Sequence, residues 1–215
     1  MLESIITEEL ISNINGFFNK YHINKSCDDI WNDIIVISKS QLKQYDFLEG
    51  MSGKYDIQAK KIILIDTKLT QRLFLHEYIH KKSVKRRLFR KDLLGICYNK
   101  HLCFFNEAIT EKITCEILSI PYEEQILHPY SSMFIAIDKL MELIEWNTIV
   151  NAYFTNDITI FKNVFSKRDF RSYLMNISVM YEVYRSLLQG DSKAALAYNT
   201  AYNIIVKIID GYTKW

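Results

Sequence analysis

The segment Leu73–Lys81 constrains the fold most, because His76, Glu77 and His80 form an H-E-x-x-H motif within it. On a helix, side chains four residues apart project from one face about one turn apart, so both imidazoles can bind one ion. Neutral imidazole suits zinc, and a carboxylate beside the metal can accept a proton from a water that zinc acidifies. The motif predicts a zinc-binding helix; the alternative is a buried amphipathic helix with two coincidental histidines.

A second motif, N-E-A-I-T-E, follows at Asn106–Glu111. Because a catalytic zinc usually has three protein ligands and one open position, Glu107 is the candidate third ligand, supplied by a second helix. Glu111 lies four residues further on the same helix face, where it can accept a hydrogen bond from His76 or His80. Two carboxylates at this spacing repel each other mildly, so a nearby cation would explain them. The alternative is a solvated acidic face.

Together the two motifs resemble those of the gluzincin metallopeptidases, and N-E-A-I-T-E is similar to the N-E-A-[IV]-S-D motif of thermolysin-like enzymes. The resemblance covers about residues 55–120 and implies that Zn²⁺ is bound by three residues: His76, His80 and Glu107. It further implies that Glu77 is the general base and that Glu111 replaces the family's aspartate behind a ligand histidine. Twenty-six residues separate His80 from Glu107, more than in thermolysin, so the connection must differ.

The resemblance also implies a residue that stabilises the oxyanion of the transition state. Tyr98 lies nine positions before Glu107, where thermolysin-like enzymes carry such a tyrosine. His128 and Tyr130 are further candidates, since gluzincins often use a downstream histidine or tyrosine. Hydrogen-bond donors of this kind stabilise developing negative charge. Each of the three residues has a packing or loop role as its alternative.

The expected fold is an α+β, zincin-like single domain spanning residues 1–215. Its first part, 1–120, would hold a small mixed or antiparallel sheet and the zinc-site helices. The remainder, 121–215, would be a helical lobe that forms the other wall of the cleft. Only six glycines and two prolines occur, which favours long helices over a turn-rich sandwich.

Hydrophobic periodicity indicates the individual elements. Strands are expected at 34–37 and, as one or two strands, within 55–65, with a short helix at about 41–47 between them. The zinc helix should begin at a cap on Asp66 or Thr67 and end near residue 82. Further helices are expected at 2–18, 106–118, 131–146, 171–188 and 192–210. By the resemblance, part of residues 54–65 would pair with substrate backbone; the alternative is an edge protected by lysines.

A basic run, Lys81–Lys91, follows the zinc helix directly. It could attract an acidic substrate or another anionic partner, although a solvated helix extension is the common alternative. The net charge of +2 gives no reason to expect nucleic acid as the partner. The first residues form no secretory signal, and no apolar run is long enough for a transmembrane segment, so we expect a cytoplasmic protein.

The sequence therefore predicts a zinc-dependent metallopeptidase that acts on peptide or protein substrates as an endopeptidase. Two alternatives stay open. One is a catalytically silent zincin-fold protein with a regulatory or binding role. The other is a protein that binds acidic partners through Lys81–Lys91.

Overall fold

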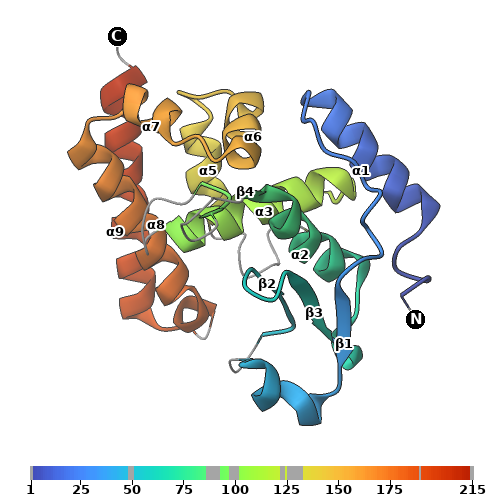
Figure 1. Cartoon of the computed structure of the whole chain (residues 1–215). Helices are drawn as coiled ribbons and strands as arrows, with labels where there is room; N and C mark the ends of the chain where they lie inside the picture. Colours follow the sequence, from blue (N-terminus) through green and yellow to red (C-terminus); the bar gives the residue numbers. More distant parts are fainter. Residues whose placement is uncertain are drawn as a thin grey trace.

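The computed structural model describes residues 2–47, 51–85, 93–96, 102–121, 124, 133–188 and 190–213. They form a mixed α+β structure that is mostly helical, with two small sheets (Figure 1). The α+β class expected from the sequence is confirmed at this level.

The larger sheet has three strands in the order β1-β3-β2. They span Ile34–Ile37 (β1), Gly53–Asp56 (β2) and Lys61–Ile65 (β3). β1 runs parallel to β3, whereas β2 runs antiparallel to it, so the sheet is mixed, which is one of the two predicted arrangements. Within the described residues β2 pairs with β3 alone, which leaves its other side as an edge of the sheet.

Both faces of β3 are buried, because its side chains alternate between two hydrophobic clusters. Ile62 and Leu64 belong to the main core, whereas Ile63 and Ile65 pack with Ile37 on the opposite face. That second face is covered by the 3₁₀ helix η1, Lys39–Tyr45, where the sequence predicted a short helix. Burial on both faces explains the uninterrupted apolar run.

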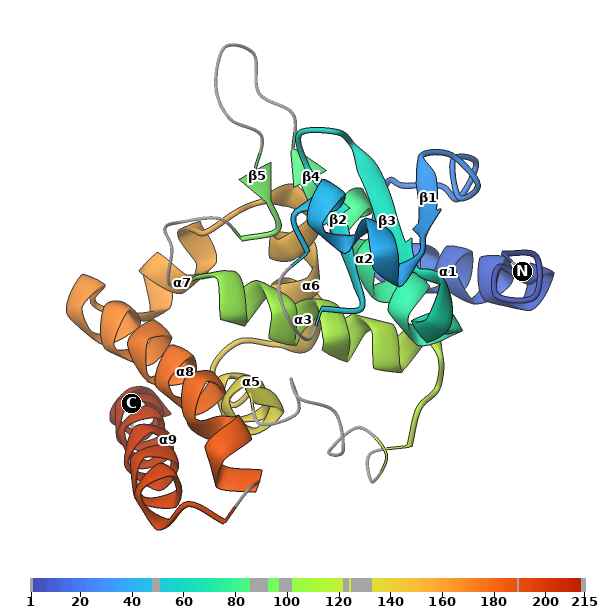
Figure 2. The same cartoon turned by 90° about the horizontal axis from the view of Figure 1, so that it is seen from below.

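The helix that carries the H-E-x-x-H motif, α2, spans Gln71–Ser83 and lies between the sheet and α3, Leu102–Ile117 (Figures 1 and 2). The predicted cap was wrong: Asp66 and Thr67 belong to a short 3₁₀ helix, Asp66–Lys68 (η2). Thr70 caps α2 instead, and its hydroxyl accepts the N–H of Leu73 at 3.1 Å. The Asp66 carboxylate accepts the N–H of Thr67 at 2.6 Å, so it is engaged ahead of α2.

The described residues from 133 to 213 are mostly helical. Their helices are Phe134–Leu140 (α5), Trp146–Thr155 (α6), Thr159–Val164 (α7), Lys167–Leu188 (α8) and Ser192–Thr213 (α9). α8 and α9 lie side by side, and α5, α6 and α8 pack against α3 (Figure 2). The second half thereby reaches the helix that carries Glu107.

Two predicted helices have different bounds. The opening helix, α1, spans Glu8–Lys20 rather than 2–18, because Thr7 caps it through the N–H of Leu10. The predicted helix at 131–146 is shorter: α5 ends at Leu140, turns follow, and Glu145 takes an extended conformation before α6.

The chain beyond α2 forms a second, two-stranded sheet instead of a helix extension. Val84–Lys85 (β4) pairs antiparallel with Leu93–Leu94 (β5). Beside this pair, Gly95 donates its N–H to the Ser83 hydroxyl at 3.1 Å. Asn106 at the start of the glutamate motif accepts from Ile96 N–H and donates to the Leu94 carbonyl, each at 2.9 Å. The β4–β5 pair is thus fixed to both α2 and α3.

Candidate metal centre

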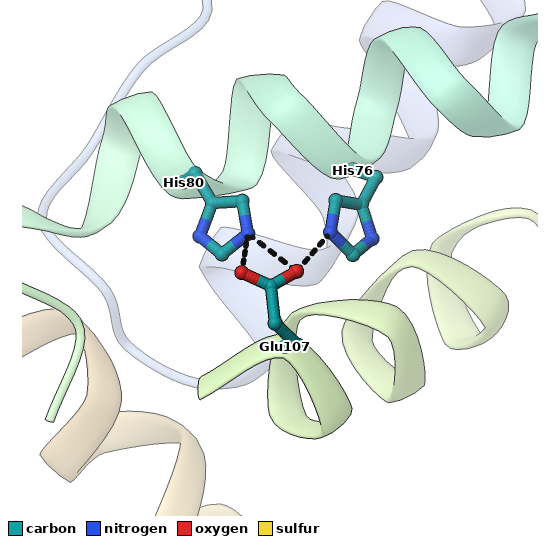
Figure 3. Close-up of side chains that lie close together, drawn as sticks. All are labelled: His76, His80 and Glu107. Atoms are coloured by element: carbon teal, nitrogen blue, oxygen red, sulfur yellow. Dashed lines mark hydrogen bonds and ion pairs between the residues drawn. The ribbon is translucent and has the colours of Figure 1, made fainter. Parts of the chain in front are cut away.

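His76 and His80 project from one face of α2 toward Glu107 of α3, as Figure 3 shows. The Nε2 atom of His76 lies 3.0 Å from Oε2 of Glu107. The Nε2 atom of His80 lies 3.3 Å from each oxygen of the same carboxylate. The two imidazole rings meet edge to face, with centroids 4.9 Å apart. Residues brought together from two helices therefore aim one ligand atom each at a common point.

These three side chains can hold a metal ion. Their candidate ligand atoms all lie within 4.8 Å of one another, and two imidazole nitrogens with one carboxylate are a donor set that zinc accepts. The histidine side chains are 7% and 4% exposed, whereas that of Glu107 is 27% exposed. Solvent therefore reaches the space between the three side chains mainly beside Glu107.

Glu111 supports His76 from behind. Its Oε2 lies 2.6 Å from Nδ1 of His76, and its Oε1 lies 2.5 Å from Nε of Arg72. The Glu111 side chain is 1% exposed, so it is a buried carboxylate between a guanidinium and an imidazole. The contact with Nδ1 leaves Nε2 of His76 directed at Glu107, which is the orientation that a metal ligand requires.

His80 has a different partner on its outer nitrogen. Two hydroxyl oxygens, of Thr110 and Tyr153, each lie 3.4 Å from His80 Nδ1. Tyr153 comes from α6 and Thr110 from α3. The two ligand histidines therefore differ: His76 is backed by a carboxylate and His80 by a pair of hydroxyls.

Glu77 lies beside the metal-binding group on α2 and faces the edge strand β2. It is 7% exposed, and its carboxylate accepts a hydrogen bond from the backbone N–H of Tyr55. Burial raises the pKa of Glu77 above its ordinary value, and the nearby His76 and His80 oppose this shift. A buried carboxylate with a raised pKa is a reasonable proton acceptor near neutral pH.

The ligand residues also perturb each other's pKa. Burial disfavours a charged His76, but its hydrogen bonds with Glu107 and Glu111 outweigh that effect and raise the His76 pKa well above its usual range. Burial likewise opposes ionisation of Glu107, yet His80 and the hydrogen bonds to both histidines hold the pKa of Glu107 well below its ordinary value. A divalent cation would take the place of the protons in these contacts.

Other residues that the sequence singled out have separate outcomes. Tyr98, His128 and Tyr130 lie outside the described residues. Within the basic run, Lys82 pairs with Asp29 at 2.9 Å, and Lys81 lies 3.4 Å from the same carboxylate. Residues 86–91 also lie outside the described part. At least two of the lysines that were candidates for an acidic partner are thus bound within the chain.

Sequence reasoning missed Arg72, Thr110 and Tyr153. Arg72 precedes His76 by four residues, so helix spacing alone places both on one face and was an available signal. Thr110 lies within the second motif and precedes Glu111. Tyr153 lies in an apolar stretch, and no local pattern distinguishes it from the other tyrosines of the chain.

Comparison of the chain with models of known protein families, with curated proteins and with solved structures finds no match. Within the described residues, none of the helices has both the length and the apolar character needed to cross a membrane.

Proposed function

We propose that the protein is a zinc-dependent metallopeptidase with a compact zincin-like fold of the gluzincin type. One observation carries the proposal: His76, His80 and Glu107 converge on one point, and the buried Glu77 carboxylate is close enough to interact electrostatically with all three. A binding site for a structural zinc would more often be closed by a fourth protein ligand. Among the described residues the group has three members, which fits a centre that keeps a position for water or substrate.

Zinc is the metal we propose, held by His76, His80 and Glu107. When bound, such an ion acts as a Lewis acid that lowers the pKa of water and polarises a carbonyl. Imidazole with one carboxylate suits zinc better than the all-oxygen sets that calcium and magnesium prefer. Glu111 contacts the outer nitrogen of His76, and the hydroxyls of Thr110 and Tyr153 lie 3.4 Å from that of His80.

Glu77 is the proposed general base. Its carboxylate accepts a proton from the attacking water and passes it to the amine nitrogen as the peptide bond breaks. The hydrogen bond from Tyr55 N–H orients the Glu77 carboxylate and connects it to β2. Because β2 has an edge beside this glutamate, an extended substrate can pair with its backbone there. One of Tyr98, His128 or Tyr130 remains the candidate for stabilising the oxyanion.

The test is cleavage of a peptide library by the zinc-loaded protein, read by mass spectrometry. We expect Glu77→Gln to lower cleavage by about 10²- to 10⁴-fold while zinc still binds, because the base is lost and the ligands remain. The exposed Glu9→Gln is the matched control and should cleave like the parent.

The outcomes separate the proposal from its alternatives. Cleavage that Glu77→Gln does not reduce contradicts the assigned base. Zinc bound at one ion per chain without any cleavage favours the catalytically silent binding protein. Absence of zinc binding removes the basis of the proposal.

A further inference from the structure

Tyr153 brings a hydroxyl from the helical half of the chain to the metal centre. Its side chain is fully buried, and its ring packs edge to face on Phe154, with centroids 5.2 Å apart. On another side the backbone of Gly95 approaches so closely that an added Cβ would lie 2.5 Å from the Tyr153 ring. Gly95 has a φ of +52°, which glycine adopts without strain. The Tyr153 hydroxyl is therefore held in one place.

The hydrogen bonds at this hydroxyl have a defined direction. Thr110 donates its proton to the backbone carbonyl of Asn106 at 2.8 Å. A carbonyl can only accept, so the proton of Thr110 is used there. With the proton of Thr110 on that carbonyl, the 2.6 Å contact between Tyr153 and Thr110 is a hydrogen bond that Tyr153 donates. Neither hydroxyl has a further proton to give to His80.

In this arrangement His80 is the donor in its contacts with both hydroxyl oxygens. Its Nδ1 lies 3.4 Å from each, which describes one N–H shared between two acceptors. We propose that Tyr153 and Thr110 are positioning residues that keep the proton of His80 on Nδ1 and leave Nε2 to bind the metal. This inference rests on the proposed metal centre and does not depend on peptide cleavage.

The two ligand histidines can be tested separately, because their supports share no residue. His76 is held by Glu111 and Arg72, whereas His80 is held by Thr110 and Tyr153. A change in the hydroxyl pair therefore perturbs one ligand and leaves the other supported. Partners of this kind typically change metal affinity by about 10- to 100-fold when removed.

The first experiment measures zinc affinity by competition with a chelator. We expect Tyr153→Phe to raise the dissociation constant about 10-fold. Tyr173→Phe is the matched control: Tyr173 is also fully buried and donates its hydroxyl, at 3.0 Å, to the Ala136 carbonyl. The zinc affinity of Tyr173→Phe should equal that of the parent protein. Equal affinities of Tyr153→Phe and Tyr173→Phe would overturn the inference.

Thr110 gives a second pair of variants. Thr110→Val removes the hydroxyl and should weaken zinc binding, whereas Thr110→Ser keeps it and should restore the affinity of the parent. Cobalt-loaded samples should show an altered visible absorption spectrum for Thr110→Val and not for Thr110→Ser. Equal weakening by both substitutions would indicate a packing role for Thr110 and would overturn its assignment.

A measurement on the unaltered protein guards against variants that do not fold. Nitrogen-15 NMR of labelled histidine reports which ring nitrogen carries the proton when the ring is neutral. A proton on Nδ1 of His80 supports the inference, and a proton on Nε2 overturns it. Without zinc the Nε2 atom of His80 faces the Glu107 carboxylate, so the NMR measurement that decides the role of the two hydroxyls is made on the zinc-loaded protein.

Discussion

Glu111 is a buried carboxylate whose two oxygens contact different partners, Arg72 and His76. Its side chain is 1% exposed, so little water can replace a partner that is lost. Substitutions that remove a partner of Glu111 should therefore lower the stability of the fold, even in the metal-free protein.

Arg72→Met is expected to lower the free energy of unfolding by about 3 kcal/mol, because it leaves the Glu111 carboxylate without its guanidinium. The measurement is urea unfolding of the metal-free protein. Adding Glu111→Gln to Arg72→Met should recover at least about 1 kcal/mol, since the buried charge is then removed as well. The exposed Arg171→Met is the control and should change stability by less than about 0.5 kcal/mol. If Arg72→Met also changes the free energy of unfolding by less than about 0.5 kcal/mol, the ion pair between Arg72 and Glu111 is contradicted.

At the scale of elements, a small polar cluster joins the start of α8 to the end of α9. Asp169 accepts hydrogen bonds from Tyr212 at 2.7 Å and from the Ser166 hydroxyl at 2.8 Å. Tyr212 also accepts the N–H of Ser166 at 2.8 Å. The hydrogen bonds from Tyr212 and Ser166 lower the pKa of Asp169 below its ordinary value of 3.8.

Tyr212→Phe should lower the free energy of unfolding by about 1 kcal/mol at neutral pH, because a hydrogen bond to the ionised Asp169 is lost. A lowered carboxyl pKa stabilises the fold above the ordinary value of 3.8, and this stabilisation is lost as the pH falls through the folded-state pKa. The difference between Tyr212→Phe and the parent should therefore shrink below about pH 4. Urea unfolding of both proteins from pH 7 to pH 3 measures this difference in the free energy of unfolding. A difference that stays constant over this range would contradict the role of Asp169.

The helices around the candidate metal centre also show how much of it the sequence could predict. The spacing of His76, Glu77 and His80 is local, so it predicted the helix and the convergence of both imidazoles correctly. The predicted start of that helix was wrong. Asp66 and Thr67 are as plausible caps as Thr70 in the sequence, and only tertiary structure selects one of them. Tyr153 could not be predicted, since its approach to His80 depends on how α6 packs.

At the scale of the whole molecule, the candidate metal centre links two helices that belong to separate parts of the chain. α2 contributes two ligands and packs on the sheet, whereas α3 contributes the third and packs on the helical half. An ion bound here therefore connects the packing of both parts.

Free zinc at 100 times its dissociation constant should raise the free energy of unfolding by about 2.7 kcal/mol, because the ion binds the folded chain and not the unfolded one. His80→Ala should remove most of this gain. Thermal or urea unfolding with and without zinc measures it, and magnesium is the control because it prefers oxygen ligands. An equal gain in His80→Ala would place the zinc elsewhere.

The packing of Tyr153 against His80 has a consequence for the order of events during synthesis. A ribosome adds roughly 5–20 residues per second, so roughly 4–15 s pass between the addition of His80 and that of Tyr153. Until α6 leaves the exit tunnel, a nascent chain that already carries His76, His80 and Glu107 lacks the hydroxyl that holds His80. Tight binding of a metal ion at this centre would therefore be reached late in translation or in the released chain.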